Sequence, residues 1–560
     1  PAPVLGPPTP PPPVPPPLVV PWGVPEGGGL SWTAYRQGGE FPRRPYTLVK
    51  AKQAAQAIGA ITLIGFASKI LGFVREMILA NYYGAGAAMD AYNIASNIPG
   101  IILAGLATAI TTTFIPAFTR RSEREGREGA FILTRNLLTA FGLAGLFLCL
   151  LGIIFAPQIT RLLAPYFDPA KAALTTKLSR ILLLGGVFTI LNGLCVGLLQ
   201  AQESFVVPAL IGFPMNLVII LAVVLFAGRF GIHALAVGTA LAAAAQVVFQ
   251  IPSLRLTGFR YRPRLDLQDP DLRRMAVLVL PVFAGTMLLQ VNTFVDRIFA
   301  SRLPVGSISA ITYANRINGF VSGIVAAAIS TVALPALSQT AAAGDHARLR
   351  QTMVYAARAM NGLVIPMAFG LVVLRTPLVR LLFERGAFDA RATAMTATAL
   401  FYLSLGLAAY GLRDIAARTF YALQDTATPM TNSLITVALN ILFLFLLVPR
   451  YGLAGLTGAT SLSGALGTLL LFVQLRLKMG PIGGHAILGS LAKVTAAAAA
   501  MAGVVWRLYP VLARLLPGEG FLPRFVILAV TSAFGAAVYA FVLWLLRAEE
   551  IAIARGLLRK

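Results

Sequence analysis

Charged side chains within long apolar runs are the residues of this sequence best placed to do chemistry. Lys69 and Arg75 lie in one apolar run, Asp90 opens the next, and Arg316 stands in ITYANRINGF with apolar sequence on both sides. A charge at the centre of a membrane helix costs about 2.5 to 3.5 kcal/mol on insertion scales, so such residues usually face a cavity. Because Arg and Lys bind phosphate and carboxylate groups, we predict that Lys69, Arg75, Asp90 and Arg316 contribute to a substrate-binding site for an anion.

Structural roles for the same charges are also open at this point. Arg75 could pair with Glu76 or Asp90, and Lys69 could extend its ammonium group to the membrane surface. Acids near the three cations are nevertheless too few to neutralise all of them. We therefore favour a cationic cavity over a set of closed ion pairs.

No enzyme constellation is recognisable. His233, His346 and His485 are far apart in the sequence, and neither a P-loop nor a catalytic serine motif is present. Cys149 and Cys195 lie in apolar runs without the spacing of a metal site. We predict transport without ATP hydrolysis by this chain and no resident cofactor, and we leave open a coupling to the membrane potential or to a monovalent cation.

The elements that must hold these charges are membrane helices. The chain is 57% hydrophobic and 12% charged, and its mean hydropathy is +0.77. Apolar runs of about 18 residues or more recur, and each can cross a hydrocarbon core of about 30 Å as a helix. We predict an all-α membrane protein with about fourteen transmembrane helices. Their approximate ranges are 53–82, 87–118, 130–155, 174–201, 204–227, 230–254, 273–300, 306–340, 350–375, 392–423, 428–448, 451–477, 484–509 and 521–547.

The net charge of +25 follows the pattern of a membrane topology and not that of a nucleic-acid-binding surface. Lys and Arg gather in alternate connections, at 43–52, 120–127 and 255–274, whereas the connections near Tyr83, Arg229, Arg302 and Arg450 are poorer in them. The basic segment from Arg375 to Arg391 is an exception. Cytoplasmic connections are enriched in basic residues, so we predict a multi-pass protein of the bacterial cytoplasmic membrane with both termini in the cytoplasm.

Internal similarity divides the chain into two halves. RFGIHALAVGTA at 229–240 resembles RYGLAGLTGATS at 450–461, and Pro208 and Pro429 keep a similar separation of about 220 residues. Two six-helix repeats in the same orientation leave a cavity between them that can open alternately to each side. The predicted domains are a disordered Pro-rich extension at 1–48, an N-terminal repeat at 49–258, a cytoplasmic linker at 259–272, a C-terminal repeat at 273–478, and two additional helices with a basic tail at 479–560.

Four segments together resemble the MurJ/MviN family of lipid II flippases, which belongs to the multidrug/oligosaccharidyl-lipid/polysaccharide exporter superfamily. They are SKILGFVREMILANYYGAGAAMDAY at 68–92, DRIFASRLPVGSISAITYANR at 296–316, LFERGAFD at 382–389 and FYALQDTATP at 420–429. The resemblance covers residues 50 to 550 approximately. It implies a fourteen-helix protein that flips an undecaprenyl-pyrophosphate-linked peptidoglycan precursor outward, with a groove for the lipid tail formed by the last two helices.

The resemblance also assigns roles to residues. The family's basic cavity residues fall on Lys69, Arg75 and Arg316, and its acidic residue at the start of the second helix falls on Asp90. Lys69 stands where the family commonly has Arg. Lysine keeps the positive charge but cannot form the two parallel hydrogen bonds of a guanidinium group. In NIPGIILAG, Gly100 and Leu103 stand where the family usually has an Asn and a further cavity Arg, so one headgroup contact is expected to be missing.

A cation site in the C-terminal repeat is a weaker expectation. Some family members hold sodium there, and Asp296 and Asn440 could match two of the ligands, but Leu444 stands where a second acid would be. Sodium coupling is therefore doubtful. Asp296 is also adjacent to Arg297, and a neutralising pair between them is equally open.

Several functions compete at this stage. Lipid II flipping by alternating access is the first, and flipping of another polyprenyl-linked glycan is the second, because Leu103 removes a basic residue. A multidrug exporter of the same superfamily would want cavity carboxylates in place of Lys69, Arg75 and Arg316, and a scaffold that transports nothing would leave buried cations without a purpose. The expected partners are lipid II or a related polyprenyl-pyrophosphate glycan and membrane lipids, with cell-wall synthesis proteins left open and nucleic acid not expected.

Overall fold

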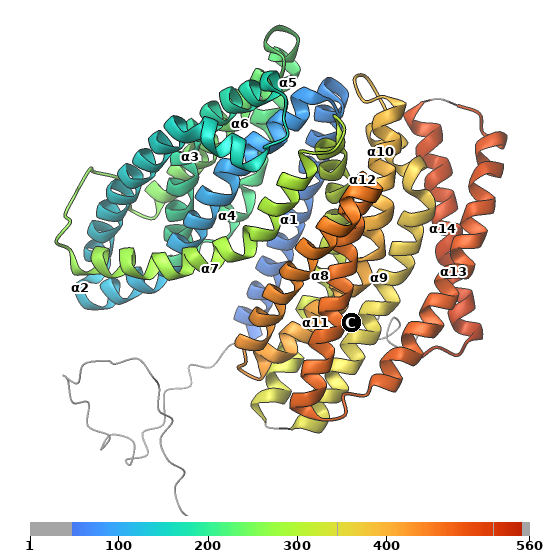
Figure 1. The fold of residues 1–560 in the computed structure, drawn as a ribbon. Coiled ribbons are helices and arrows are strands. Elements are labelled where there is room, and N and C mark those ends of the chain that lie inside the picture. The colour runs from blue at the N-terminus through green and yellow to red at the C-terminus, as the bar shows by residue number, and fades with distance from the viewer. Residues whose placement is uncertain (1–47, 344, 519, 551–560) are drawn as a thin grey trace, which may run out of the picture. The chain divides into compact units, whose positions relative to one another are not determined.

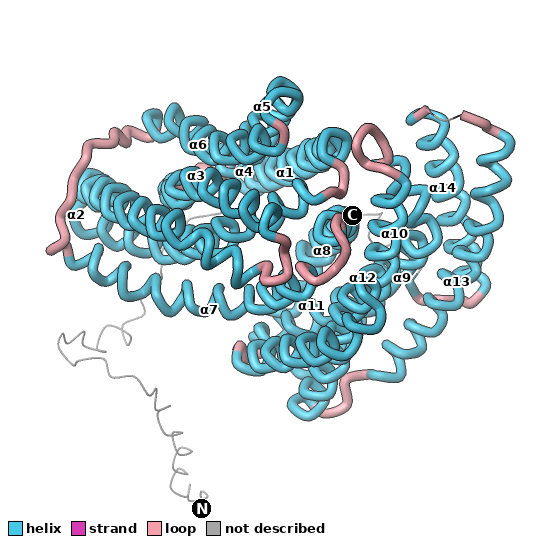
Figure 2. The backbone as a smooth tube through the Cα atoms, turned by 45° about the horizontal axis from the view of Figure 1, so that its top comes forward, coloured by secondary structure: helices cyan, strands magenta, loops and turns pink. Residues whose placement is uncertain are grey.

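The computed structural model describes residues 48–343, 345–518 and 520–550, and the regular elements of that part are α-helices (Figure 2). Most of the predicted Pro-rich extension and the end of the basic tail lie outside the described residues. The helices, labelled in Figure 1, are α1 (Leu48–Tyr83), α2 (Ala87–Leu163), α3 (Pro169–Ala201), α4 (Val206–Leu210), α5 (Gly212–Phe230), α6 (Ile232–Leu256), α7 (Pro270–Ala300), α8 (Ser307–Ala342), α9 (His346–Phe383), α10 (Ala390–Leu405), α11 (Leu407–Ala422), α12 (Ala427–Met479), α13 (Gly484–Leu515) and α14 (Phe521–Leu545).

The predicted spans fall within helices, with different groupings. Nine helical segments of the described part are long and apolar enough to cross a membrane, or up to ten if the bent α7 counts as one span. The fold class is therefore that of an all-α multi-pass membrane protein, and the count of fourteen stays a prediction. Two elements, α2 and α12, each contain two of the predicted spans, and α10 and α11 together form one of them.

Both long elements fold back on themselves at a glycine. The rings of Phe118 and Phe131 in α2 are 6.3 Å apart, although thirteen residues of straight helix would separate them by about 20 Å. The chain turns at Gly126, which has a φ of 73°. In α12 the turn is at Gly452, with a φ of 55°, and Ser463 donates across it to Asn440 at 3.3 Å. A residue with a side chain would be strained in this left-handed conformation.

Matching backbone conformations accompany the internal similarity. Gly231 and Gly452, which are paired in the aligned segments, both have a φ of 55°. Glu203 and Gln424 precede the paired prolines at equivalent positions, and their φ angles are 59° and 58°. Positive φ is uncommon outside glycine, so its recurrence at the same spacing supports two repeats with the same local fold.

The connections between successive helices gather alternately at the two ends of the helix bundle. At one end the Tyr83 hydroxyl donates to the Gly231 carbonyl at 3.1 Å, and Ala387 N donates to the Asn81 carbonyl at 2.8 Å. At the other end Arg127 donates to the Thr257 carbonyl at 2.6 Å. Two of the basic connections predicted for one side of the membrane, 120–127 and 255–274, thus contact each other. Connections predicted for the opposite side also contact one another.

Helix α7 contacts both repeats. Its two parts, Pro270–Met287 and Gln290–Ala300, are inclined by 44°. The first part packs on α2, where a Cβ at Gly105 would come within 2.6 Å of Met287. The second part packs on α12, and the rings of Phe299 and Phe445 are 4.9 Å apart. The boundary between the linker and the C-terminal repeat at 272 stays a prediction, and part of the helix that follows it belongs by packing to the N-terminal repeat.

Candidate functional site

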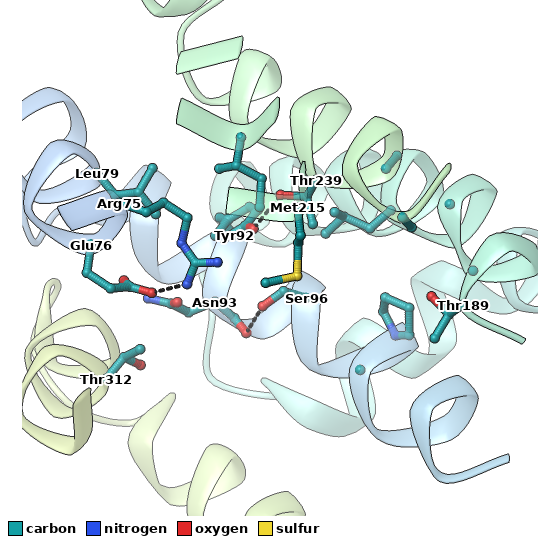
Figure 3. Close-up of a pocket in the computed structure, with 18 of the residues that line it drawn as sticks. Arg75, Glu76, Leu79, Tyr92, Asn93, Ser96, Thr189, Met215, Thr239 and Thr312 are labelled. Atoms are coloured by element: carbon teal, nitrogen blue, oxygen red, sulfur yellow. Dashed lines mark hydrogen bonds and ion pairs between the residues drawn. The ribbon is translucent and has the colours of Figure 1, made fainter. Parts of the chain in front are cut away.

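A polar cavity of about 350 Å³ lies among α1, α2, α3, α5, α6 and α8. Arg75 and Glu76 enter it from α1 and Arg316 from α8, and Figure 3 shows the Arg75 side chain directed toward the Glu76 carboxylate. We call it the Arg75 cavity. Its remaining polar lining consists of neutral groups: Tyr92, Asn93, Ser96, Thr189, Thr239, Gln246 and Thr312.

One carboxylate serves two guanidinium groups in this cavity. Glu76 Oε1 is 2.5 Å from Arg75 Nη2 and 3.3 Å from Arg316 Nε. Glu76 is buried with a side-chain exposure of 5%, whereas Arg316 is 55% exposed. Arg75 also donates to Asn216 Oδ1 at 3.0 Å, and its Nε has no hydrogen-bond partner. The cluster therefore keeps an excess positive charge and free donor capacity.

Lys69 provides a second level of positive charge along the same helix pair. Its ammonium nitrogen lies 3.4 Å from the place that a Cβ on Gly323 of α8 would occupy. Gly323 is seven residues beyond Arg316, and Lys69 is seven residues before Glu76, so the two levels are about 10 Å apart along the helices. Lys69 is exposed and does not line the Arg75 cavity itself.

Asp90 lies outside this cavity. Its carboxylate is 1% exposed and accepts from Lys171 Nζ at 3.0 Å, Gly306 N at 2.8 Å, Ser309 N at 2.9 Å and Ser309 Oγ at 2.7 Å. Gly306 and Ser309 begin α8, so this acid binds the positive N-terminus of a helix from the other repeat. In this conformation Asp90 ties the two repeats together, and its oxygens are already occupied by protein donors.

The contacts of Asp90 belong to a larger set that joins the repeats at this end. The Tyr313 hydroxyl donates to the Gly84 carbonyl at 3.2 Å. A Cβ on Gly84 would lie 2.1 Å from the Ala387 carbonyl oxygen. The two backbone segments can therefore approach this closely only because Gly84 lacks a side chain. We call the contacts of Gly84, Asp90, Gly306, Ser309 and Ala387 the end seal.

Of Gly100 and Leu103, only the glycine lines the Arg75 cavity. Gly100 lines the Arg75 cavity, whereas Leu103 is 2% exposed and packs beside Gly186 and Cys149. Residues three apart point about 60° apart around a helix, which is enough to turn Leu103 into the apolar core. Leu103 therefore does not line this cavity, and the expected loss of a headgroup contact at this position stays a prediction.

Asp296 and Asn440 come together in the C-terminal repeat. The Asn440 amide donates to Asp296 Oδ1 at 3.0 Å and to Asn292 Oδ1 at 2.8 Å. Leu444 is fully buried one turn later. The described part of the chain holds no group of three His, Cys, Asp or Glu side chains suited to a metal ion. Asn292 and Ser463 join the same hydrogen-bond network, and a sodium site at Asp296 and Asn440 stays a prediction.

Arg297 is not paired with Asp296 in the manner of a closed ion pair. Successive residues of a helix point about 100° apart, and Arg297 Nε is buried without a hydrogen-bond partner. Both Asp90 and Asp296 act on its charge at longer range. A neutralising neighbour pair, which the sequence left open, is therefore not formed at hydrogen-bond distance.

Some residues of the site escaped the sequence argument. Asn216, which holds Arg75, and Thr312, which lines the cavity beside Arg316, are neutral residues in apolar helices. Ser, Thr and Asn are frequent in membrane helices for reasons of packing. No signal in the sequence distinguishes these two from the others.

Two helical repeats, a cationic cavity and an end seal between the repeats define a polytopic helical transporter. A family model described as "Lipid II flippase MurJ" matches residues 79–524. A probable lipid II flippase MurJ of Vibrio cholerae is 31% identical over 440 residues, which are 75% of this chain and 82% of that protein. The chain belongs to the lipid II flippase MurJ family.

Further comparisons agree in sequence and in fold. A lipid II flippase MurJ of Burkholderia cenocepacia is 29% identical over 429 residues, covering 74% of this chain and 83% of that protein. A solved structure of lipid II flippase MurJ in an inward closed conformation has a TM-score of 0.73 at 25% identity, covering 88% of this chain and 99% of that one. An inward-facing multidrug resistance MATE family transporter of the MOP superfamily shares the fold, with a TM-score of 0.59 at 15% identity over 76% of this chain and 98% of that one.

Proposed function

We propose that this chain is a lipid II flippase, which moves the undecaprenyl-pyrophosphate-linked headgroup from the cytoplasmic to the outer leaflet by alternating access. The observation that carries the proposal is the excess positive charge of the Arg75 cavity, where two guanidinium groups share the single Glu76 carboxylate. Two adjacent phosphates can accept from both guanidinium groups at once. Membership of the family supports the substrate.

The cations are positioned to compete for a pyrophosphate. Arg316 is more than half exposed and can turn from Glu76 toward a ligand, while Arg75 lines the cavity beside it. Lys69 lies about two helical turns away and is free to attract the ligand before it reaches the cluster. The neutral groups Asn93, Ser96 and Thr312 supply hydrogen bonds suited to a glycan.

Alternating access requires one end of the cavity to be closed at a time. The end seal supplies that closure, since Asp90 joins α2 to the start of α8. We place this end on the outer side, because the connections near Tyr83 and Arg302 are poor in Lys and Arg, although the segment from Arg375 to Arg391 is basic. Both termini are then placed in the cytoplasm. Opening would exchange the Asp90 contacts for water and release the headgroup outward.

A flipping assay with purified full-length protein in lipid II-containing liposomes tests the proposal. Arg75→Ala and Arg316→Ala are each expected to reduce flipping by at least about tenfold, because each loses a charge-assisted contact to the phosphates. Arg229→Ala is the matched control, because Arg229 is exposed at the end of α5 and stacks on Phe230. Full activity in both cavity variants, with normal membrane insertion, would exclude this mechanism.

Lipid II and another polyprenyl-pyrophosphate glycan share the group that the cations bind. The same liposomes loaded with a polyprenyl-pyrophosphate sugar that lacks the peptide separate these two substrates. We expect lipid II to be transported faster. Equal transport of both lipids would assign the chain to a broader range of lipid-linked glycans.

A further inference from the structure

A second cavity, of about 540 Å³, lies in the C-terminal repeat between α7, α11 and α12. Arg413 of α11 lines it together with Tyr410 and Tyr421 of the same helix and Ser433 of α12. We call it the Arg413 cavity. It shares none of its lining residues with the Arg75 cavity. The transport mechanism proposed above makes no use of it.

Arg413 has only neutral partners. Its Nη2 donates to Ser433 Oγ at 3.1 Å and lies 3.5 Å from Asn432 Oδ1. Among the described residues no carboxylate lies within 4.0 Å of its guanidinium group. The residue lies within Ala390–Ala422, a segment long and apolar enough to span the membrane. A cation at this depth usually faces a cavity and has a binding partner.

The acids nearest to Arg413 in the sequence are engaged elsewhere. Asp414 accepts from Arg418 Nε at 2.8 Å, on the same helix. Asp425 lies in the turn before α12, where it pairs with Lys478 and accepts from Thr428 N at 3.0 Å. The hydrogen bond from Lys478 holds the pKa of Asp425 at about 2, so this acid stays ionised and bound to its own partner.

The lining of the cavity is not uniform in charge. Asn292 and Asn440 line it, and the Asn440 amide donates to Asp296, whose carboxylate disfavours an anion beside them. Arg413, Tyr421 and Ser433 also line the cavity, and Ser433 precedes Asn440 by seven residues, about 10 Å along α12. A small anion would therefore settle against Arg413.

We infer that the Arg413 cavity is an anion-binding site for an oxyanion of the phosphate or carboxylate class, held by the Arg413 guanidinium group and the Ser433 hydroxyl. Two sources can supply this chemistry: a free inorganic ion or the phosphate of a lipid headgroup. The guanidinium group has donors to spare, because only one of its nitrogens is engaged in the hydrogen bonds to Asn432 and Ser433. The inference is independent of lipid II, because it rests on a cavity that the flipping mechanism does not use.

Thermal unfolding of the full chain in nanodiscs tests the inference. In nanodiscs of phosphatidylcholine, inorganic phosphate is compared with sodium chloride at equal ionic strength. A second arm replaces part of the neutral lipid with phosphatidylglycerol. Stabilisation by phosphate in the first arm identifies a free ion as the ligand, and stabilisation confined to the second arm identifies a lipid headgroup.

Arg413→Gln is the informative variant, because glutamine keeps a donor for Ser433 and removes the charge. We expect it to weaken the apparent affinity for the stabilising anion by about tenfold or more. Arg418→Gln is the matched control, since Arg418 lies on the same helix and is already paired with Asp414. Arg413→Lys should fall between the two, because lysine keeps the charge and lacks the fork.

Two results would overturn the inference. The first is the absence of stabilisation by either anion in the unmodified chain. The second is equal stabilisation of Arg413→Gln and Arg418→Gln. Loss of basal stability in Arg413→Gln does not hide the answer, because each variant is compared with itself with and without the anion. The outcome of the flipping assay with Arg75→Ala does not affect this test, because the two experiments concern different cavities.

Discussion

Replacing Glu76 by glutamine tests the shared carboxylate directly. The Arg75 and Arg316 nitrogens contact the same Glu76 oxygen at 2.5 and 3.3 Å, so they can be no further apart than the sum of these distances, about 5.8 Å. Two unit charges at that separation repel by about 3 kcal/mol at an effective dielectric constant of about 20. Because Arg316 is 55% exposed, solvent reduces this figure, and we expect about 1 to 2 kcal/mol.

The expected outcome has two parts. Without a ligand, Glu76→Gln should unfold at a lower temperature than the unmodified chain, because the two cations lose their common partner. With inorganic pyrophosphate the variant should gain more stability than the unmodified chain, because the anion no longer competes with a carboxylate. A difference of 1 to 2 kcal/mol corresponds to roughly five- to thirtyfold tighter pyrophosphate binding.

Thermal unfolding in detergent over a pyrophosphate titration measures both parts. Glu128→Gln is the matched control, because Glu128 is 67% exposed and pairs with a single Arg135 at 2.8 Å. If Glu76→Gln showed the same pyrophosphate dependence as the unmodified chain, Glu76 would not compete with pyrophosphate for Arg75 and Arg316. The electrostatic reasoning about the site would then be wrong.

The remaining predictions concern the end seal. Asp90→Asn should lose about 3 to 5 kcal/mol of local stability, since an amide cannot accept from all four donors that now surround the carboxylate. Hydrogen exchange of the amides at 306–309 should accelerate, and Asp345→Asn, at the exposed cap of α9, should leave them unchanged; equal protection in both would contradict the seal. Gly84→Ala should cost on the order of 1 to 3 kcal/mol, because φ is +58° and the new Cβ would lie 2.1 Å from the Ala387 oxygen. Gly86→Ala meets nothing within 4 Å, so a similar fall in unfolding temperature for both glycines would refute this account.

The sequence predicted the framework of the site because membrane burial acts locally. A charge such as Arg316 within an apolar run is costly wherever the run packs, so its exposure to a cavity follows from its neighbours in the chain. The repeat was also visible in the sequence, because a local requirement left a mark there: the turns at Gly231 and Gly452 have positive φ, which favours glycine. Basic connections likewise predict a topology without any knowledge of packing.

The roles of individual acids could not be predicted in the same way. Glu76 near the end of α1 and Asp90 near the start of α2 are separated only by the short connection between these helices, and both are nearly fully buried. Glu76 contacts two arginines in a cavity, and Asp90 binds the first amides of α8, more than two hundred residues later. Which helix faces meet is a property of the packed repeats, and the spacing of residues along one helix carries no information about it.

The sequence by itself determined that this protein is a bundle of membrane helices in two repeats, with three cations, Lys69, Arg75 and Arg316, that need a polar environment. Only the tertiary structure decided that two of them share Glu76, that Asp90 closes one end, that Leu103 faces the core, and that Arg413 lines a second cavity. The physical reason is that the cost of burying a charge depends on the apolar residues around it in the chain, whereas its neutralisation depends on partners that folding brings from distant helices.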